Sequence, residues 1–171
     1  IGHGYAAIRE AQAALAAGGS SECVEGGAGG AESASGATSL LGALRGLGLP
    51  DGLTFELCPT SSKATGAWAG SDWARHPVAL LSRLRAASEA AGDMDGSRHL
   101  PRVTISSDDP SVFDSSLTDE LILAVDAMGL GEGDLMMAMR NAAEAAFLPP
   151  PAKTRLLARL ARAWESWSEG A

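Results

Sequence analysis

Two adjacent carboxylates, Asp108 and Asp109, stand between a short segment of alternating apolar and polar residues and a proline. Like charges held so close repel each other, and a bound cation such as zinc relieves that repulsion. Neighbouring side chains of a regular strand point to opposite faces, so both can serve one site only where the strand has ended or bulged. The pair predicts either a metal and ligand site or an Asx turn or helix cap before Pro110.

A histidine, His3, lies between Gly2 and Gly4, so its backbone can adopt unusual dihedral angles and no bulky neighbour crowds the imidazole. Such a histidine suits metal binding or general-base work, and the alternative is a glycine turn in which it makes only local hydrogen bonds. We expect the chemistry of this chain from His3, Asp108 and Asp109.

Two other candidates have simpler interpretations. Cys58 has no CxxC or Cys/His neighbour, so we expect it to pack as a small buried side chain. His76 precedes a proline at a predicted helix start, which favours a structural role.

Polar residues follow three segments that are typical of β-strands. A short apolar run from Ile1 ends at His3, residues 53–58 lead into Pro59-Thr60-Ser61-Ser62, and residues 102–106, which alternate apolar and polar side chains, lead to Asp108 and Asp109. A helix predicted over 77–91 separates the last two strands and favours parallel pairing. The fold class is therefore α/β, with polar residues at the carboxyl ends of strands, where barrels of alternating strands and helices build their active sites.

The rest of the chain is predicted to be helical, apart from one insertion. Helical spacing of apolar residues predicts helices at 5–17, 40–46, 121–128, 133–147 and 152–167, and Ser116 with Asp119 forms a capping arrangement before the third of them. Residues 18–38 are rich in Gly, Ala and Ser and are predicted to be a flexible low-complexity insertion.

The composition excludes several classes of partner. Hydrophobic residues make up 46% and charged residues 20% of the 171 residues, which excludes wholesale disorder, and no apolar run is long enough to span a membrane. The formal net charge of −8 argues against nucleic acid or an anionic membrane as the main partner. The composition is compatible with a site for a small molecule.

Four groups of residues resemble, in this order, the C-terminal part of the adenosine deaminases. They are Ile1-Gly-His-Gly-Tyr5; Phe55-Glu-Leu-Cys-Pro59 with Ser61-Ser62 and Thr65-Gly-Ala-Trp68; Ser107-Asp-Asp-Pro110 with Phe113; and Asn141-Ala-Ala143 with Phe147-Leu-Pro149 and Lys153. Each group alone is a weak signal. The specific signal is that all four occur in this order along most of the chain.

The resemblance implies a zinc-dependent (β/α)₈ barrel that removes the 6-amino group of adenosine to give inosine and ammonia. In the family, the residue at the position of Asp108 is a zinc ligand and that at Asp109 hydrogen-bonds the purine ring. The histidine at the position of His3 stands beside the zinc-bound water. The expected partner is thus a purine nucleoside, and residues 1–171 are expected to form the C-terminal part of one barrel domain.

The family draws its other zinc ligands from His-x-His and His-Ala-Gly-Glu motifs, and neither occurs in this sequence. We therefore expect the remaining ligands upstream of Ile1 and about three barrel strands within the chain, which should be inactive in isolation. The alternatives are an adenine- or AMP-type deaminase, a secreted growth-factor-type deaminase, and a non-catalytic truncated homologue that acts as a binding module. The compartment, with the cytoplasm favoured over secretion, and the oligomeric state stay open.

Overall fold

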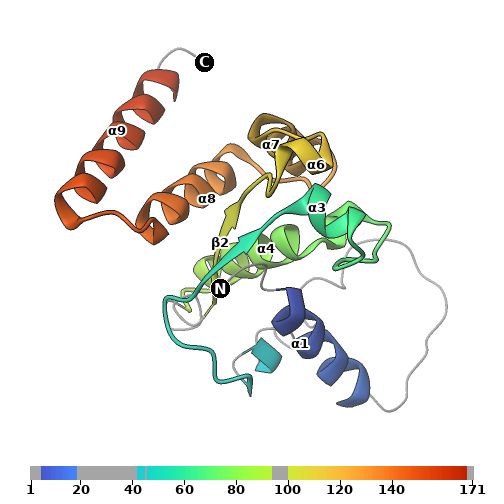
Figure 1. Ribbon diagram of the computed structural model, residues 1–171. Coiled ribbons are helices and arrows are strands. Elements are labelled where there is room, and N and C mark those ends of the chain that lie inside the picture. The colour runs from blue at the N-terminus through green and yellow to red at the C-terminus, as the bar shows by residue number, and fades with distance from the viewer. Residues whose placement is uncertain (1–4, 19–41, 45, 94–99, 169–171) are drawn as a thin grey trace.

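The computed structural model describes residues 5–18, 42–44, 46–93 and 100–168 (Figure 1). The predicted strand that ends at His3 and nearly all of the low-complexity segment 18–38 lie outside these residues. His3 itself also lies outside the described residues.

A two-stranded parallel sheet lies at the centre of the described part. Strand β1 (Thr54–Leu57) pairs with β2 (Arg102–Ile105), with Phe55 opposite Val103. Helix α4 (Pro77–Ala90) lies between the strands in sequence and supplies the crossover that a parallel pair needs. The two predicted strands that lie within the described residues, and their parallel pairing, are confirmed.

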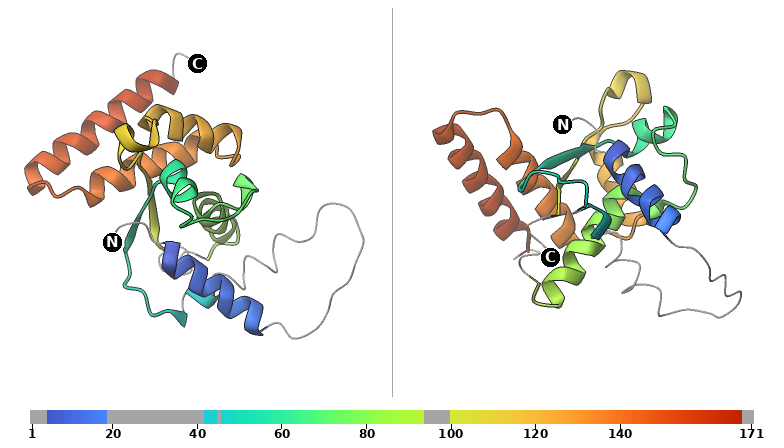
Figure 2. Two further views of the ribbon diagram at one scale, coloured as in Figure 1. Left: turned by 45° about the vertical axis from the view of Figure 1, so that its right-hand side comes forward. Right: turned by 90° about the horizontal axis from the view of Figure 1, so that it is seen from below.

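The hydrophobic core joins the sheet to helices that come before, between and after the two strands in the sequence. Helix α1 (Tyr5–Gly18) buries Ile8 against a cluster that includes Phe55 and Leu57 of β1. Figures 1 and 2 show α1 on the far side of the sheet from the C-terminal helix α9 (Pro150–Ser168).

None of the helices in the described ranges is long and apolar enough to cross a bilayer.

A short helix that periodicity did not predict follows each strand. Helix α3 (Pro59–Ala64) follows β1 and helix α6 (Pro110–Phe113) follows β2, and both begin with a proline. A 3₁₀ helix, η1 (Trp73–Arg75), precedes α4. Segments of this length contain less than two helical turns, so their apolar residues cannot establish a period.

Helix α7 (Leu117–Asp126) starts where its predicted cap places it. The Ser116 hydroxyl accepts a hydrogen bond from the Asp119 amide at 3.3 Å, and the Asp119 carboxylate accepts from the Ser116 amide at 2.8 Å. This reciprocal capping box confirms the predicted arrangement and begins the helix directly after Ser116.

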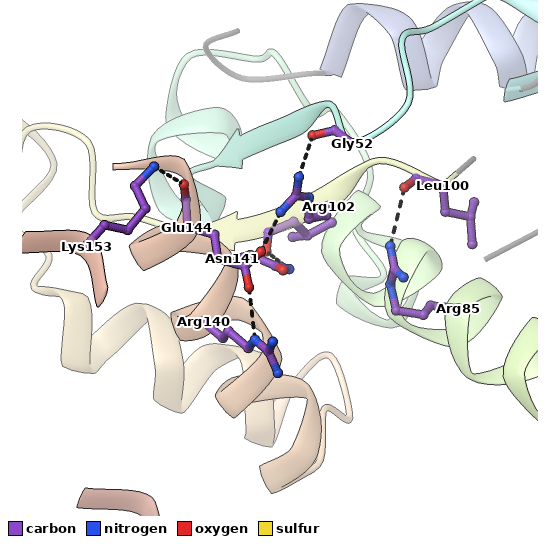
Figure 3. A network of polar contacts seen from close by, with 9 residues as sticks. Gly52, Arg85, Leu100, Arg102, Arg140, Asn141, Glu144 and Lys153 are labelled. Carbon is purple, nitrogen blue, oxygen red and sulfur yellow. Dashed lines mark hydrogen bonds and ion pairs between the residues drawn. The ribbon is translucent and has the colours of Figure 1, made fainter. Parts of the chain in front are cut away.

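Helix α8 (Glu132–Ala145) is fastened to β2 by a polar network (Figure 3). The Asn141 amide donates to the Val103 carbonyl at 2.9 Å, and the Arg102 guanidinium pairs with Glu144 at 2.5 Å. Lys153 of α9 donates to the Glu144 carbonyl at 2.6 Å. The network thus gives a structural reason for Asn141 and Lys153, two residues of the fourth family-like group.

Candidate functional site

The candidate site lies where the two neighbouring strands end. Beyond Leu57 of β1 the chain enters α3, and beyond Ile105 of β2 it reaches Asp108 and Asp109 (Figure 1). The Ser61 hydroxyl on α3 donates a hydrogen bond to Oδ2 of Asp108 at 2.6 Å. The parallel sheet therefore brings polar side chains from the ends of both strands into direct contact.

The backbone at Asp108 departs from strand geometry. Its φ of 62° lies in the left-handed region, which is uncommon outside glycine and which aspartate tolerates better than most residues. Strand β2 ends at Ile105, so the alternation of side chains between two faces no longer applies at Asp108. Because the strand has ended before Asp108, the two neighbouring carboxylates can both serve one site. The carboxylate of Asp108 is exposed to solvent.

Asp109 makes the helix-capping contact that its position before Pro110 predicts. Its Oδ1 accepts a hydrogen bond from the Ser111 amide at 3.2 Å, which makes it the N-cap of α6. The side chain is exposed and the bond uses one of its two carboxylate oxygens. The cap is thus an observed role for Asp109, and its contact with substrate stays a prediction.

A buried polar network supports α3 from behind. The Tyr5 hydroxyl lies 3.1 Å and the Ser62 hydroxyl 3.5 Å from Nε2 of His76, and Ser62 donates to the Pro59 carbonyl at 2.8 Å. The Ser62 proton is therefore directed at a backbone carbonyl, which argues against a nucleophilic serine. Tyr5 and His76 are 71 positions apart, and nothing in the sequence pattern links them.

His76 is the N-cap of α4, as its position before a proline indicates. Its Nδ1 accepts from the Val78 amide at 3.3 Å, which assigns the ring proton to Nε2. Burial lowers the pKa of His76 to about 3, so the imidazole is neutral at physiological pH. Its structural role is confirmed.

Cys58 is a free, buried thiol at the junction of β1 and α3. Burial, with a smaller effect of the Asp108 charge, raises the pKa of Cys58 to about 12. A thiol of that pKa is a poor nucleophile and a poor metal ligand near neutral pH. Its predicted packing role is confirmed.

No sequence pattern identifies Glu120, in the first turn of α7, as a residue that supports the site. It is fully buried, and its Oε2 accepts a hydrogen bond from the Thr60 amide at 3.1 Å. Its place in the sequence resembles that of an ordinary acidic residue near a helix start, so no local signal could have identified the contact.

One candidate metal ligand is present in the described ranges. No group of three or more His, Cys, Asp or Glu side chains that could hold a metal ion occurs among them. Asp108 fits a role as one ligand because its carboxylate is exposed and oriented by a hydroxyl donor. A complete site at Asp108 needs further ligands from beyond the described residues.

The family model and curated relatives that match this chain are deaminases. The model described as adenosine deaminase matches residues 1–163. An adenine deaminase of Rhizobium leguminosarum bv. trifolii is 39% identical over 109 residues, which cover 64% of this chain and 29% of that protein. An adenine deaminase of Agrobacterium fabrum is 38% identical over 109 residues, or 64% of this chain and 28% of that protein.

The aligned region thus spans less than a third of the length of these relatives. The family match nevertheless covers nearly the whole chain, including both described strands and the paired carboxylates that follow β2. The chain belongs to the adenosine deaminase family.

Proposed function

We propose that the complete protein carrying this chain hydrolyses the exocyclic amine of a 6-aminopurine. The oxygen of water is added to C6 of the purine, the bond from C6 to the amino nitrogen breaks, and ammonia leaves. The observation that carries the proposal is the Ser61 to Asp108 hydrogen bond, because it orients an exposed carboxylate at the ends of two adjacent parallel strands.

Asp108 is the proposed zinc ligand of this chain. A hydroxyl donor on one carboxylate oxygen restricts the rotation of the carboxylate, which is how hydrogen-bond partners orient metal ligands. Zinc, when bound, lowers the pKa of a coordinated water toward 7. The other ligands are proposed to lie outside the described residues.

Asp109 is proposed to contact the purine ring, and His3 is proposed as the catalytic histidine beside the reacting water. The cap on α6 holds Asp109 next to the metal ligand while leaving its second oxygen available. An imidazole can accept the proton that water loses, provided that it is neutral at the working pH.

Adenine is the first substrate to test, and adenosine is the second. Relatives at 36–39% identity bear the name adenine deaminase. The Gly66-Ala-Trp68 sequence, which resembles that of the ordinary adenosine deaminases, favours the nucleoside. Both substrates contain the same reacting C6 amine, so the same roles of His3, Asp108 and Asp109 are proposed with either.

The fold proposed for the complete protein is a (β/α)₈ barrel of which β1 and β2 are adjacent strands. The parallel pair, the crossover helix α4 and the position of the polar residues at the strand ends support this arrangement.

The test compares variants of the complete protein for zinc content and for turnover of adenine and adenosine, followed by the change in ultraviolet absorbance. Asp108→Ala should lose zinc and turnover together. Asp109→Ser should retain zinc and lose turnover, since serine preserves the cap of α6 but withdraws the carboxylate. Equal zinc loss in both variants would contradict the division of roles, and a wild-type protein without zinc or turnover would refute the proposed function.

A further inference from the structure

The segment from Asp108 to Glu120 is attached to α3 at both of its ends. Near its start, Oδ2 of Asp108 accepts from the Ser61 hydroxyl at 2.6 Å. At its end, Oε2 of Glu120 accepts from the Thr60 amide at 3.1 Å. Two carboxylates of one segment therefore bind adjacent residues of the helix that follows β1.

Glu120 supplies the cap that α3 lacks. The N-cap residue of α3, Cys58, makes no side-chain capping bond, and Pro59 has no amide hydrogen. The first amide of the helix that needs an external acceptor is that of Thr60, which donates to Glu120. The carboxylate thus fixes the turn that carries Ser61.

The burial of the Glu120 carboxyl group costs free energy. Glu120 is fully buried, and its Oε1 has no hydrogen-bond partner among the described residues. Taking a carboxyl group out of water costs free energy, which one hydrogen bond from a neutral amide offsets only in part. A requirement for stability alone therefore does not explain a carboxylate at this position.

We propose that Glu120 is a positioning residue for the metal ligand Asp108. It holds the Thr60 amide, which fixes the first turn of α3, and the Ser61 hydroxyl in that turn then orients the Asp108 carboxylate. The inference rests on the proposed function, because it assigns to Asp108 the role of a zinc ligand.

The test uses three variants of the complete protein. Glu120→Met removes the acceptor and keeps the volume, Glu120→Gln keeps an oxygen acceptor, and Asn141→Ala removes a buried hydrogen bond to β2 at a position away from α3. Zinc affinity is measured by competition with a chelator, stability by chemical denaturation, and the Thr60 amide by hydrogen exchange.

Glu120→Met should bind zinc about tenfold more weakly, and it should lose about as much stability as Asn141→Ala, because each variant leaves one backbone group without its hydrogen-bond partner. Its Thr60 amide should exchange faster by a similar factor. Glu120→Gln should restore both quantities, and Asn141→Ala should lose stability without a change in zinc affinity. This split between affinity and stability distinguishes positioning from a general structural role.

Unchanged zinc affinity and unchanged Thr60 exchange in Glu120→Met would overturn the inference, as would a Glu120→Gln variant as weak as Glu120→Met. If the Met variant fails to fold, Glu120→Asp, which withdraws the carboxylate by one methylene group, carries the same expectation. A wild-type protein that neither binds zinc nor deaminates purines refutes the proposed function instead, and Thr60 exchange still tests the contact between Glu120 and α3.

Discussion

The Ser61 hydroxyl donates a 2.6 Å hydrogen bond to the carboxylate of Asp108, a residue 47 positions away in the sequence. The bond joins the ends of β1 and β2 because parallel strands present their carboxyl ends at one edge of the sheet. Ser61 is buried whereas Asp108 is exposed, so the hydroxyl holds the carboxylate from the protein side and leaves its outer side accessible.

Ser61→Ala should weaken zinc binding by the complete protein about 10- to 100-fold, which is the usual effect of removing a partner of a metal ligand. Asp108 should then rotate more freely, and its left-handed backbone should lose a restraint. The measurement is the zinc dissociation constant from chelator competition.

Thr65→Ala is the matched control for Ser61→Ala. Thr65 donates its hydroxyl to the Ser61 carbonyl at 2.9 Å, so its replacement removes a hydroxyl next to the same helix without touching Asp108. Zinc affinity should be close to that of the wild type in this variant. A Ser61→Ala protein with wild-type zinc affinity would show that the hydroxyl does not orient the ligand.

The sequence predicts the sheet and the location of the site because both follow from local patterns. Strands at 53–58 and 102–106 are bounded by turn residues, and a helix between them favours parallel pairing. The carboxylates after the second strand are therefore placed at the same edge of the sheet as the polar residues after the first strand before any contact is known. The cap by Asp109 is equally local, since it spans two residues.

The supporting contacts of the site escape prediction because they are not local. Glu120 meets an amide 60 positions away, and His76 meets a hydroxyl 71 positions away. Both side chains have ordinary local interpretations, as a residue near a helix start and as a helix cap. Which backbone group or hydroxyl they reach depends on the packing of α3, α4 and α7, which is determined only when the chain folds.

His76 should make the stability of the protein depend on pH. Because burial lowers its pKa to about 3, the unfolded chain binds a proton below about pH 6.5 that the folded protein does not bind. Stability is thus fully retained above pH 6.5 and falls with decreasing pH until the folded pKa is reached. Between pH 7 and pH 5 this single group should cost about 2 kcal/mol.

The measurement compares the free energy of unfolding of the wild type and of His76→Asn at the two pH values. Asparagine preserves a capping acceptor for the Val78 amide and does not titrate. The variant should therefore lose about 2 kcal/mol less than the wild type between pH 7 and pH 5. Parallel pH profiles of the two proteins would show that His76 takes up a proton in the folded state.

Cys58 should be inert toward alkylating and disulfide reagents in the native protein. With burial and the Asp108 charge raising its pKa to about 12, almost no thiolate is present at pH 8. In a Cys23→Ser background, where Cys58 is the remaining thiol, modification in the native state should be at least about 100-fold slower than in denaturant. Comparable rates in both states would contradict the burial of this thiol.

Asn141 should contribute to stability through the edge of β2. The amides of Arg102 and Ser106 donate to carbonyls of Leu53 and Leu57, so these residues direct their backbone groups toward β1. Successive residues of a strand direct their backbone groups to opposite edges. Val103 follows Arg102, so its carbonyl faces away from β1 and accepts a hydrogen bond from Asn141. The side chain thus satisfies a backbone group that the sheet of the described strands leaves unpaired.

Asn141→Leu keeps most of the volume but removes the donor, and it should lower the free energy of unfolding by about 1–3 kcal/mol because a buried carbonyl loses its partner. Arg140→Ala, which changes the exposed neighbour of Asn141, should stay within about 0.5 kcal/mol of the wild type. Zinc affinity should be unchanged in both variants, since neither residue contacts Asp108 or Ser61. An Asn141→Leu protein as stable as the wild type would mean that another donor satisfies the Val103 carbonyl once Asn141 is removed.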